Sequence, residues 1–262
     1  MKETSLWVRI PHKAPIFLDV KHMGILNNYE HKLFSQHGED GITIKIIESL
    51  YTDPYNKYYV EFGVESGTEC NTRVLREQYS WTGLMMDGSH EDANINLKRE
   101  LVTKENAVQL FQKYNVPDHI HLLSVDIDYN DFYCVKEILK HYTCDILIFE
   151  YNGTHLPHED KVVKYTRTGG WDGHSNYFGA SLLVWKKLTA MYGYTLVCCD
   201  SSGTNCFFIR NNMLNLSEAL YADANDLTLL YKSPTYGPGP NGGHSQDTLN
   251  RAYVSFEEAI NI

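Results

Sequence analysis

Short apolar runs alternate with amphipathic segments along most of the chain. The apolar runs predict buried strands near residues 58–62, 81–87, 121–128 and 144–152, with a shorter strand at 101–103. The amphipathic segments between them predict helices at 40–51, 71–79, 91–101, 104–114, 131–142 and 177–192, and a short last helix is expected near Phe256. Two further runs, 194–199 and 206–210, flank a polar turn and predict an antiparallel hairpin.

This alternation of strands and helices is typical of an α/β fold. It predicts a mostly parallel, Rossmann-like sheet with helices on both faces and the hairpin at one edge. We expect one catalytic domain at 35–212, after an N-terminal extension (1–34) and before a C-terminal extension (213–262) that packs on it. Residues 153–176 have no periodicity and are too many for a plain connection, so they are expected to form a substrate loop or lid.

Composition narrows the classes of partner and of cellular compartment. The 262 residues carry a formal net charge of −10 and no cluster of Lys and Arg, which disfavours binding to nucleic acid. The six cysteines form no CxxC pair, which favours a reduced, cytoplasmic protein. Residues 1–11 lack the apolar stretch of a signal peptide, and no run approaches the ~20 apolar residues of a membrane span.

The stretch Tyr58–Gly67 has the pattern of a strand followed by a ligand-binding turn. Gly63 and Gly67 allow a backbone conformation and a close approach that other residues hinder, although glycines also punctuate ordinary turns. Asp87 follows Glu61 by 26 residues, close to the spacing of about 20 between a nucleotide turn and a ribose-binding acid. A solvated acid at a strand end is the alternative for Asp87.

Polar side chains gather at the predicted strand ends. Parallel strands end on the same side of a sheet, where ligands bind, so these side chains are expected around one crevice: Glu61, Asp87, Asp126, Asp128, Glu150 and Asn152. Carboxylates that close together repel one another unless a cation or a proton offsets their charge. The crevice is therefore expected to receive a positively charged occupant.

These residues resemble a class I S-adenosylmethionine-dependent methyltransferase, and most closely the FkbM-like methyltransferases. The resemblance covers about Ser35 to Arg210 and rests on four short motifs: residues 35–40 (SQHGED), 60–63 (VEFG), 71–72 (NT) and 81–84 (WTGL). It implies that Gly63 and Gly67 face the methionine end of the cofactor, with Glu61 at the turn. It implies that Asp87, with Ser89 beside it, holds the ribose, that Glu105 or Asn106 lies near the adenine, and that Asp126 also contacts the cofactor. Glu65 stands where the family's usual motif has a glycine.

A second resemblance, to catechol O-methyltransferase and its relatives, implies a metal site. Those enzymes hold Mg²⁺ between an acid ending one strand and an acid and an Asn ending the next, and the matching residues here are Asp126, Asp128, Glu150 and Asn152. Mg²⁺ or Mn²⁺ suits such oxygen ligands and would lower the pKa of a substrate hydroxyl. Cofactor contacts or a charge cluster without metal are the alternatives. The candidate bases are Asp128, His155, His158 and His174.

We therefore expect an S-adenosylmethionine-dependent methyltransferase that acts on an oxygen of a small molecule, such as a sugar or a nucleotide-linked sugar, with divalent metal assistance. One alternative is a glycosyltransferase that uses Asp126-Ile127-Asp128 as a DxD metal site. Another is a nucleoside-binding protein without catalysis. The sequence leaves the oligomeric state open, a dimer included.

Overall fold

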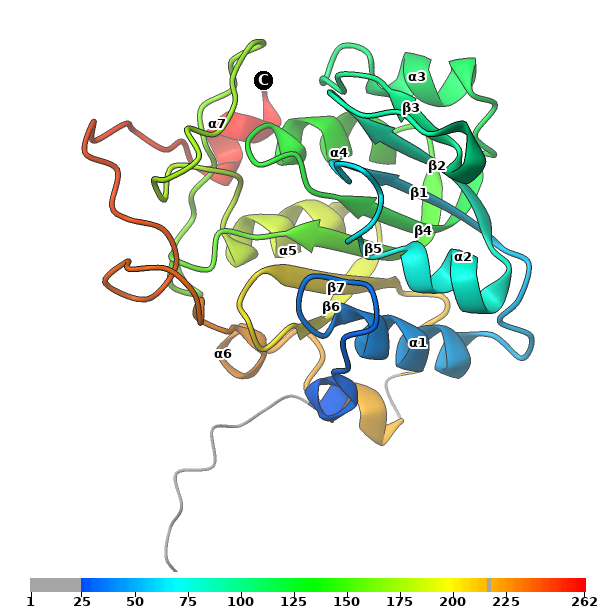
Figure 1. Cartoon of the computed structure of the whole chain (residues 1–262). Coiled ribbons are helices and arrows are strands. Elements are labelled where there is room, and N and C mark those ends of the chain that lie inside the picture. Colours follow the sequence, from blue (N-terminus) through cyan, green and yellow to red (C-terminus); the bar gives the residue numbers. More distant parts are fainter. Residues whose placement is uncertain (1–24, 216–217) are drawn as a thin grey trace, which may run out of the picture.

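The computed structural model of the chain describes residues 25–215 and 218–262 (Figure 1). Most of the predicted N-terminal extension, 1–34, lies outside the described residues. None of the described helices is long and apolar enough to cross a membrane. All six cysteines are buried, and none forms a disulfide.

The core of the molecule is one seven-stranded sheet with the order β3-β2-β1-β4-β5-β7-β6. The strands are β1 (Tyr58–Phe62), β2 (Thr82–Asp87), β3 (Leu97–Arg99), β4 (His119–Val125), β5 (Thr143–Glu150), β6 (Tyr194–Cys199) and β7 (Asn205–Arg210). The first five strands pair in parallel, and β7 runs antiparallel to both β5 and β6. The predicted Rossmann-like fold, with its antiparallel hairpin, is therefore confirmed.

Helices cover both faces of this sheet (Figure 1). One face packs against α1 (Glu39–Leu50) and α2 (Arg73–Tyr79), and the other packs against α3 (Ala107–Lys113), α4 (Asp131–Leu139), α5 (Leu182–Met191) and α7 (Phe256–Ile260). Within β5 the two faces alternate, since Leu147 and Phe149 join one core and Ile146 and Ile148 join the other. Burial of β5 on both faces explains its continuous apolar run.

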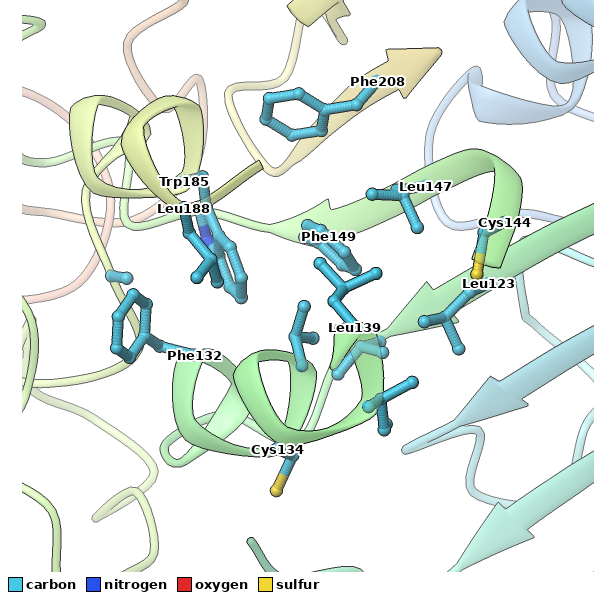
Figure 2. Packing of buried hydrophobic residues seen from close by; sticks show 14 of the residues in the cluster. Leu123, Phe132, Cys134, Leu139, Cys144, Leu147, Phe149, Trp185, Leu188 and Phe208 are labelled. Atoms are coloured by element: carbon cyan, nitrogen blue, oxygen red, sulfur yellow. The ribbon is translucent and has the colours of Figure 1, made fainter. Parts of the chain in front are cut away.

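Aromatic packing fixes the carboxyl end of β5 against α5 (Figure 2). Trp185 stacks on Phe149 with ring centroids 4.5 Å apart, and both side chains are fully buried. The Trp185 indole also donates a hydrogen bond to the backbone oxygen of Glu150 at 2.8 Å. This contact holds the strand end from which the Glu150 side chain projects.

The predicted helix at 91–101 is wrong. The segment forms a short 3₁₀ turn, η2 (Ala93–Ile95), and then β3, so the third strand lies earlier than the predicted 101–103. Asp92 accepts a hydrogen bond from the backbone of Asn94, and Asn96 has a left-handed φ of 54° with its amide donating to the Gly83 oxygen at 2.6 Å. These local bonds end the turn after three residues and direct the chain alongside β2.

The predicted helix at 177–192 begins only at Leu182. Its expected first turn is extended because Asn152 donates to the backbone oxygens of Asn176 and Phe178, and because Gly179 has a φ of 51°. The other predicted helices and the hairpin form within a few residues of their expected bounds. The smaller elements are η1 (Ile25–Tyr29), η3 (Ala219–Tyr221) and α6 (Leu227–Leu230).

Candidate active site

A cavity of about 950 Å³ opens at the carboxyl ends of the parallel strands. It lies where the strand order reverses between β1 and β4, the position at which open α/β sheets bind ligands. Residues from the ends of β1, β2, β4 and β5 line it, together with parts of the 153–176 loop and of the C-terminal segment.

The turn after β1 has a shape that glycine allows. Gly63 has a φ of +81°, and a Cβ there would lie 1.4 Å from the backbone oxygen of Asp126. Position 63 therefore brings the end of β1 against the end of β4. Gly67 has a φ of +70° and closes the turn by donating its N–H to Val64 at 2.8 Å. Gly63 lines the cavity, and Gly67 is absent from its lining.

Glu61 is buried and holds the start of α2. Its carboxylate accepts hydrogen bonds from the backbone N–H groups of Asn71 and Thr72, at 2.8 and 2.9 Å, and from the hydroxyls of Thr72 and Ser124. Burial raises the pKa of Glu61, and these donors partly offset the rise. Glu61 thus lines the cavity and also stabilises the backbone just before α2.

Glu65, which stands where the resemblance expects a glycine, adopts a glycine-like backbone. Its φ is 47°, in the left-handed region that most residues avoid. Its N–H donates to the Asp87 carboxylate at 2.9 Å, and this bond stabilises the unusual conformation. The turn therefore keeps its shape although its side chain differs.

Asp87 joins this turn to the end of β2. One carboxylate oxygen accepts from Glu65, and the other accepts from the backbone and hydroxyl of Ser89 at 2.8 and 2.7 Å. Burial alone would raise the pKa of Asp87, but the hydrogen bonds from Ser89, His90 and Glu65 hold it below its usual value. Asp87 is therefore ionised at the cavity wall beside Ser89, which also lines the cavity.

Asn106 shapes the cavity from outside its lining. Its side chain accepts from the backbone of Thr103 at 2.7 Å and donates to the oxygen of Leu101 at 2.9 Å. Leu101, Val102 and Thr103 line the cavity, whereas Asn106 and Glu105 are absent from the lining. Glu105 instead accepts a hydrogen bond from the Tyr165 hydroxyl.

Three of the four predicted metal ligands come together. Carboxylate oxygens of Asp126, Asp128 and Glu150 all lie within 4.8 Å of one another. Burial and the charges of neighbouring acids raise the pKa of Asp126 and of Glu150 well above the usual carboxyl range. Asp128 has a φ of 65°, and burial followed by the charge of Glu65 raises its pKa as well. The set has the oxygen chemistry that Mg²⁺ and Mn²⁺ favour.

Asn152, the fourth predicted ligand, is engaged elsewhere. It is fully buried and does not line the cavity. Its amide nitrogen donates to Asn176 and Phe178, and its amide oxygen accepts from the backbone and hydroxyl of Thr154. Asn152 thus ties the end of β5 to the 153–176 loop.

The predicted histidine bases lie outside this cavity. His155 is 3% exposed and lines a separate cavity of about 430 Å³, where burial followed by the charge of Lys161 lowers its pKa to about 4. His174 and His158 are exposed and line neither cavity. Among the predicted bases, only Asp128 borders the main cavity.

An aromatic wall, formed by Trp171, Phe178, Tyr236 and His244, was missed from the sequence. All four side chains line the cavity, and His244 contacts each of the other three, while Trp171 also contacts Phe178, with ring centroids 4.4 to 5.9 Å apart. Two come from the 153–176 loop and the residues just after it, and two flank the Gly- and Pro-rich stretch 237–243. That stretch was the available signal, because a Tyr and a His border it.

The cavity is rich in acidic groups. Eight carboxylates line it: Glu61, Glu65, Glu69, Asp87, Glu100, Asp126, Asp128 and Glu150. Arg167 is the only Lys or Arg side chain in the lining among residues 25–215 and 218–262. This charge favours a cationic occupant and opposes a polyanionic one.

A second group with metal-ligand chemistry lies at the opposite ends of the strands from the cavity. His119, His121 and Asp145 have ligand atoms within 4.8 Å of one another, near the amino ends of β4 and β5. Nδ1 of His121, however, accepts a hydrogen bond from the Tyr58 backbone, which places the ring proton of a neutral imidazole on Nε2. Metal-binding histidines instead donate from their second nitrogen, so this group fits a hydrogen-bond network with the Tyr51 hydroxyl.

Comparisons with known proteins add a distant structural likeness. No protein-family model matches the chain, and no curated protein matches it in sequence. A solved structure titled "Crystal structure of SeMet-Substituted CurJ carbon methyltransferase" matches with 10% identity and a TM-score of 0.35. The match covers 67% of this chain and 55% of that chain, so this chain spans about half the length of its match. A likeness this distant carries no argument about the reaction, and the FkbM-like resemblance stays a prediction.

Proposed function

We propose that this protein is an S-adenosylmethionine-dependent methyltransferase that transfers the methyl group to an oxygen of a small, hydroxyl-bearing molecule. One observation carries the proposal. A glycine turn, an ionised acid at the end of the next strand and a cluster of carboxylates border one cavity at the reversal of the strand order. This combination suits a ligand with a ribose at one end and a positive charge at the other.

The lining residues would bind different parts of the cofactor. The turn at 63–67, Asp87 and Ser89 would bind the methionine and ribose portions, and Leu101 and Val102 would cover the adenine with apolar surface. Asp126 and Glu150 lie beside this turn, because the backbone of Asp126 contacts Gly63 and the acids cluster at the ends of β4 and β5. A sulfonium beside them would favour their ionised forms, and it loses its positive charge as the methyl group leaves.

The three-carboxylate cluster also fits a divalent cation. Mg²⁺ or Mn²⁺ bound there would lower the pKa of the acceptor hydroxyl. Asp126, Asp128 and Glu150 would hold it, with water or the acceptor completing the shell. Burial, followed by the charges of neighbouring acids, raises the pKa values of Asp126 and Glu150, and such a cation would offset both effects.

The charge of the cavity bears on the acceptor. A neutral sugar fits eight carboxylates and an aromatic wall better than a nucleotide-linked sugar does, because a diphosphate would be repelled unless the metal offset its charge. Both remain within the proposal as acceptors, and the aromatic wall offers a flat apolar surface to the face of a sugar ring.

Calorimetric titration tests the cofactor. The wild type should bind S-adenosylmethionine with a micromolar Kd. It should also bind Mg²⁺ in a separate titration, and the Glu150→Gln variant should bind Mg²⁺ more weakly than the wild type. A protein that ignores S-adenosylmethionine but binds a nucleotide sugar with Mn²⁺ would instead be the DxD-type glycosyltransferase. Binding of adenosine without any turnover would point to a non-catalytic nucleoside-binding protein.

Turnover assays test the reaction itself. The protein should release S-adenosylhomocysteine in the presence of one member of a panel of neutral sugars and nucleotide sugars, and a chelator should slow that release. Unchanged turnover with chelator would remove the metal from the proposal and leave the methyl transfer in place.

A further inference from the structure

The stretch from Tyr236 to His244 folds back on itself and presents its two ends to the cavity. Three backbone bonds close it, from Gly239 to the Gly243 oxygen, from Gly242 to the Gly239 oxygen, and from Gly243 to the Tyr236 oxygen. Gly242 has a φ of +82°, and a Cβ there would lie 1.9 Å from the Pro234 oxygen. The glycines are thus what allows Tyr236 and His244, eight positions apart, to contact each other.

The His244 side chain packs against aromatic rings and makes no hydrogen bond within the described residues. Its imidazole packs against Trp171, Phe178 and Tyr236, with centroid distances of 4.4, 5.7 and 5.4 Å. Among the described residues no hydrogen bond reaches its ring nitrogens, and neither nitrogen is a buried atom without a partner. The ring is therefore positioned by packing, lines the cavity and has accessible nitrogens.

Tyr236 of the aromatic wall lies near the acidic cluster of Asp126, Asp128 and Glu150. Burial, followed by the charges of Glu150, Asp200 and Asp126, raises the pKa of the Tyr236 phenol, which places that ring near the ends of β5 and β4. His244 contacts Tyr236 and so also lies near these strand ends. Asp87 and Leu101, by contrast, come from β2 and the connection after β3.

We propose that His244 is the base that accepts the proton of the acceptor hydroxyl. The inference rests on the proposed methyl transfer and names the residue that completes it. The acceptor oxygen forms a bond to the methyl carbon as the carbon–sulfur bond breaks and its electron pair stays on sulfur. The hydroxyl proton passes to the free nitrogen of His244, and no oxidant or reductant takes part.

The charged surroundings of His244 keep it ready for this role. Burial lowers the pKa of His244, and the charge of Asp172 works in the opposite direction with a smaller effect. Asp172 is itself paired with Arg251 and accepts from the hydroxyl of Ser175. The other groups packed on the ring are Trp171, Phe178 and the un-ionised Tyr236. His244 is therefore neutral near pH 7 and able to accept a proton.

Histidine titration by NMR tests this placement without turnover. His244 is assigned by the loss of its signal in the His244→Phe variant, which keeps a ring in the aromatic wall. Its midpoint should fall by about half a pH unit or more with S-adenosylmethionine relative to S-adenosylhomocysteine, because only the former carries a sulfonium charge near the imidazole. Equal midpoints, with both ligands bound by calorimetry, would overturn the role of His244 but not the methyl transfer. Failure of both ligands to bind would overturn the two together.

Kinetics with an acceptor from the sugar panel provide a second readout. The His244→Phe variant should turn over about 10² to 10⁴-fold more slowly while binding S-adenosylmethionine within twofold of the wild type. The wild-type rate should fall as the pH drops through the midpoint of His244, and the variant should lose this dependence. His141, exposed beyond the end of α4, provides the matched His→Phe control, which should leave turnover unchanged. Wild-type turnover in His244→Phe would overturn the proposal.

Discussion

At the scale of single residues, the acids at the strand ends differ in charge because their surroundings differ. Glu61 is buried under four hydrogen-bond donors, and its carboxylate serves the turn. Asp87 receives donors at the cavity wall, and these keep it ionised. Burial, followed by the charges of neighbouring acids, raises the pKa values of Asp126 and Glu150. The same functional group, a carboxyl, thus meets three different surroundings in one cavity.

Removing the charge of Asp87 should weaken cofactor binding. Asp87→Asn keeps the size of the side chain but removes its charge and one of the two oxygens that accept from Glu65 and Ser89, so the proposed charge-assisted hydrogen bonds to the ribose hydroxyls should be lost. The Kd of S-adenosylmethionine should rise about 10- to 100-fold, since such bonds contribute roughly 1.5–3 kcal/mol. Calorimetry provides the measurement, with Asp118→Asn as the control, because Asp118 is exposed just before the amino end of β4. Equal affinity in both variants would contradict the ribose assignment.

At the scale of elements, the site depends on how closely β1 and β4 approach at their ends. Gly63 N–H donates to the Met86 oxygen of β2, and its Cα faces the backbone of Asp126. A single position thus joins three neighbouring strands at the floor of the cavity. The same approach brings the turn and the acidic cluster to one crevice.

Replacing Gly63 by Ala should therefore damage the fold. The new Cβ would meet the Asp126 oxygen at 1.4 Å in a backbone of positive φ, and we expect a loss of at least about 3 kcal/mol in the free energy of unfolding. Urea denaturation measures this loss. Gly170→Ala is the matched control, since nothing lies within 4 Å of its Cβ position and its φ needs no glycine, so its effect should stay within about 1 kcal/mol. Similar effects of the two substitutions would show that the close approach is not needed.

Elements whose signal is local could be predicted from the sequence, and elements set by distant contacts could not. The strands β4 and β5 were predictable because their apolar runs are buried on both faces. The start of α5 was not, because Asn152, about 30 positions earlier, holds residues 176–178 extended. The acidic cluster followed from strand ends alone. His244 was hidden, since only the folded loop at 236–244 brings it back to the cavity.

At the scale of the whole molecule, folding gathers eight carboxyl groups around one cavity. Its eight carboxylates come from separate stretches between β1 and the end of β5, so folding forces together charges that are far apart in the unfolded chain. Burial and mutual repulsion raise the pKa values of Asp126 and Glu150 in the folded state. Ionisation of these two acids therefore opposes folding.

This arrangement predicts how stability depends on pH. A carboxyl whose pKa is raised on folding binds more protons in the folded than in the unfolded state, so it contributes a loss of stability as the pH rises from about 4 towards its folded pKa. Without metal, the melting temperature of Glu150→Gln should therefore decline less over this range than that of the wild type, whereas Asp118→Asn should follow the wild type.

Mg²⁺ competes with protons for the same oxygens, so it should stabilise the wild type more at pH 8 than at pH 5. At a Mg²⁺ concentration of 100 times its Kd, the stabilisation should be about 2.7 kcal/mol. Scanning calorimetry with and without Mg²⁺ measures both effects. Equal stabilisation at the two pH values, or in Glu150→Gln, would mean that the cation binds somewhere other than the three-carboxylate cluster.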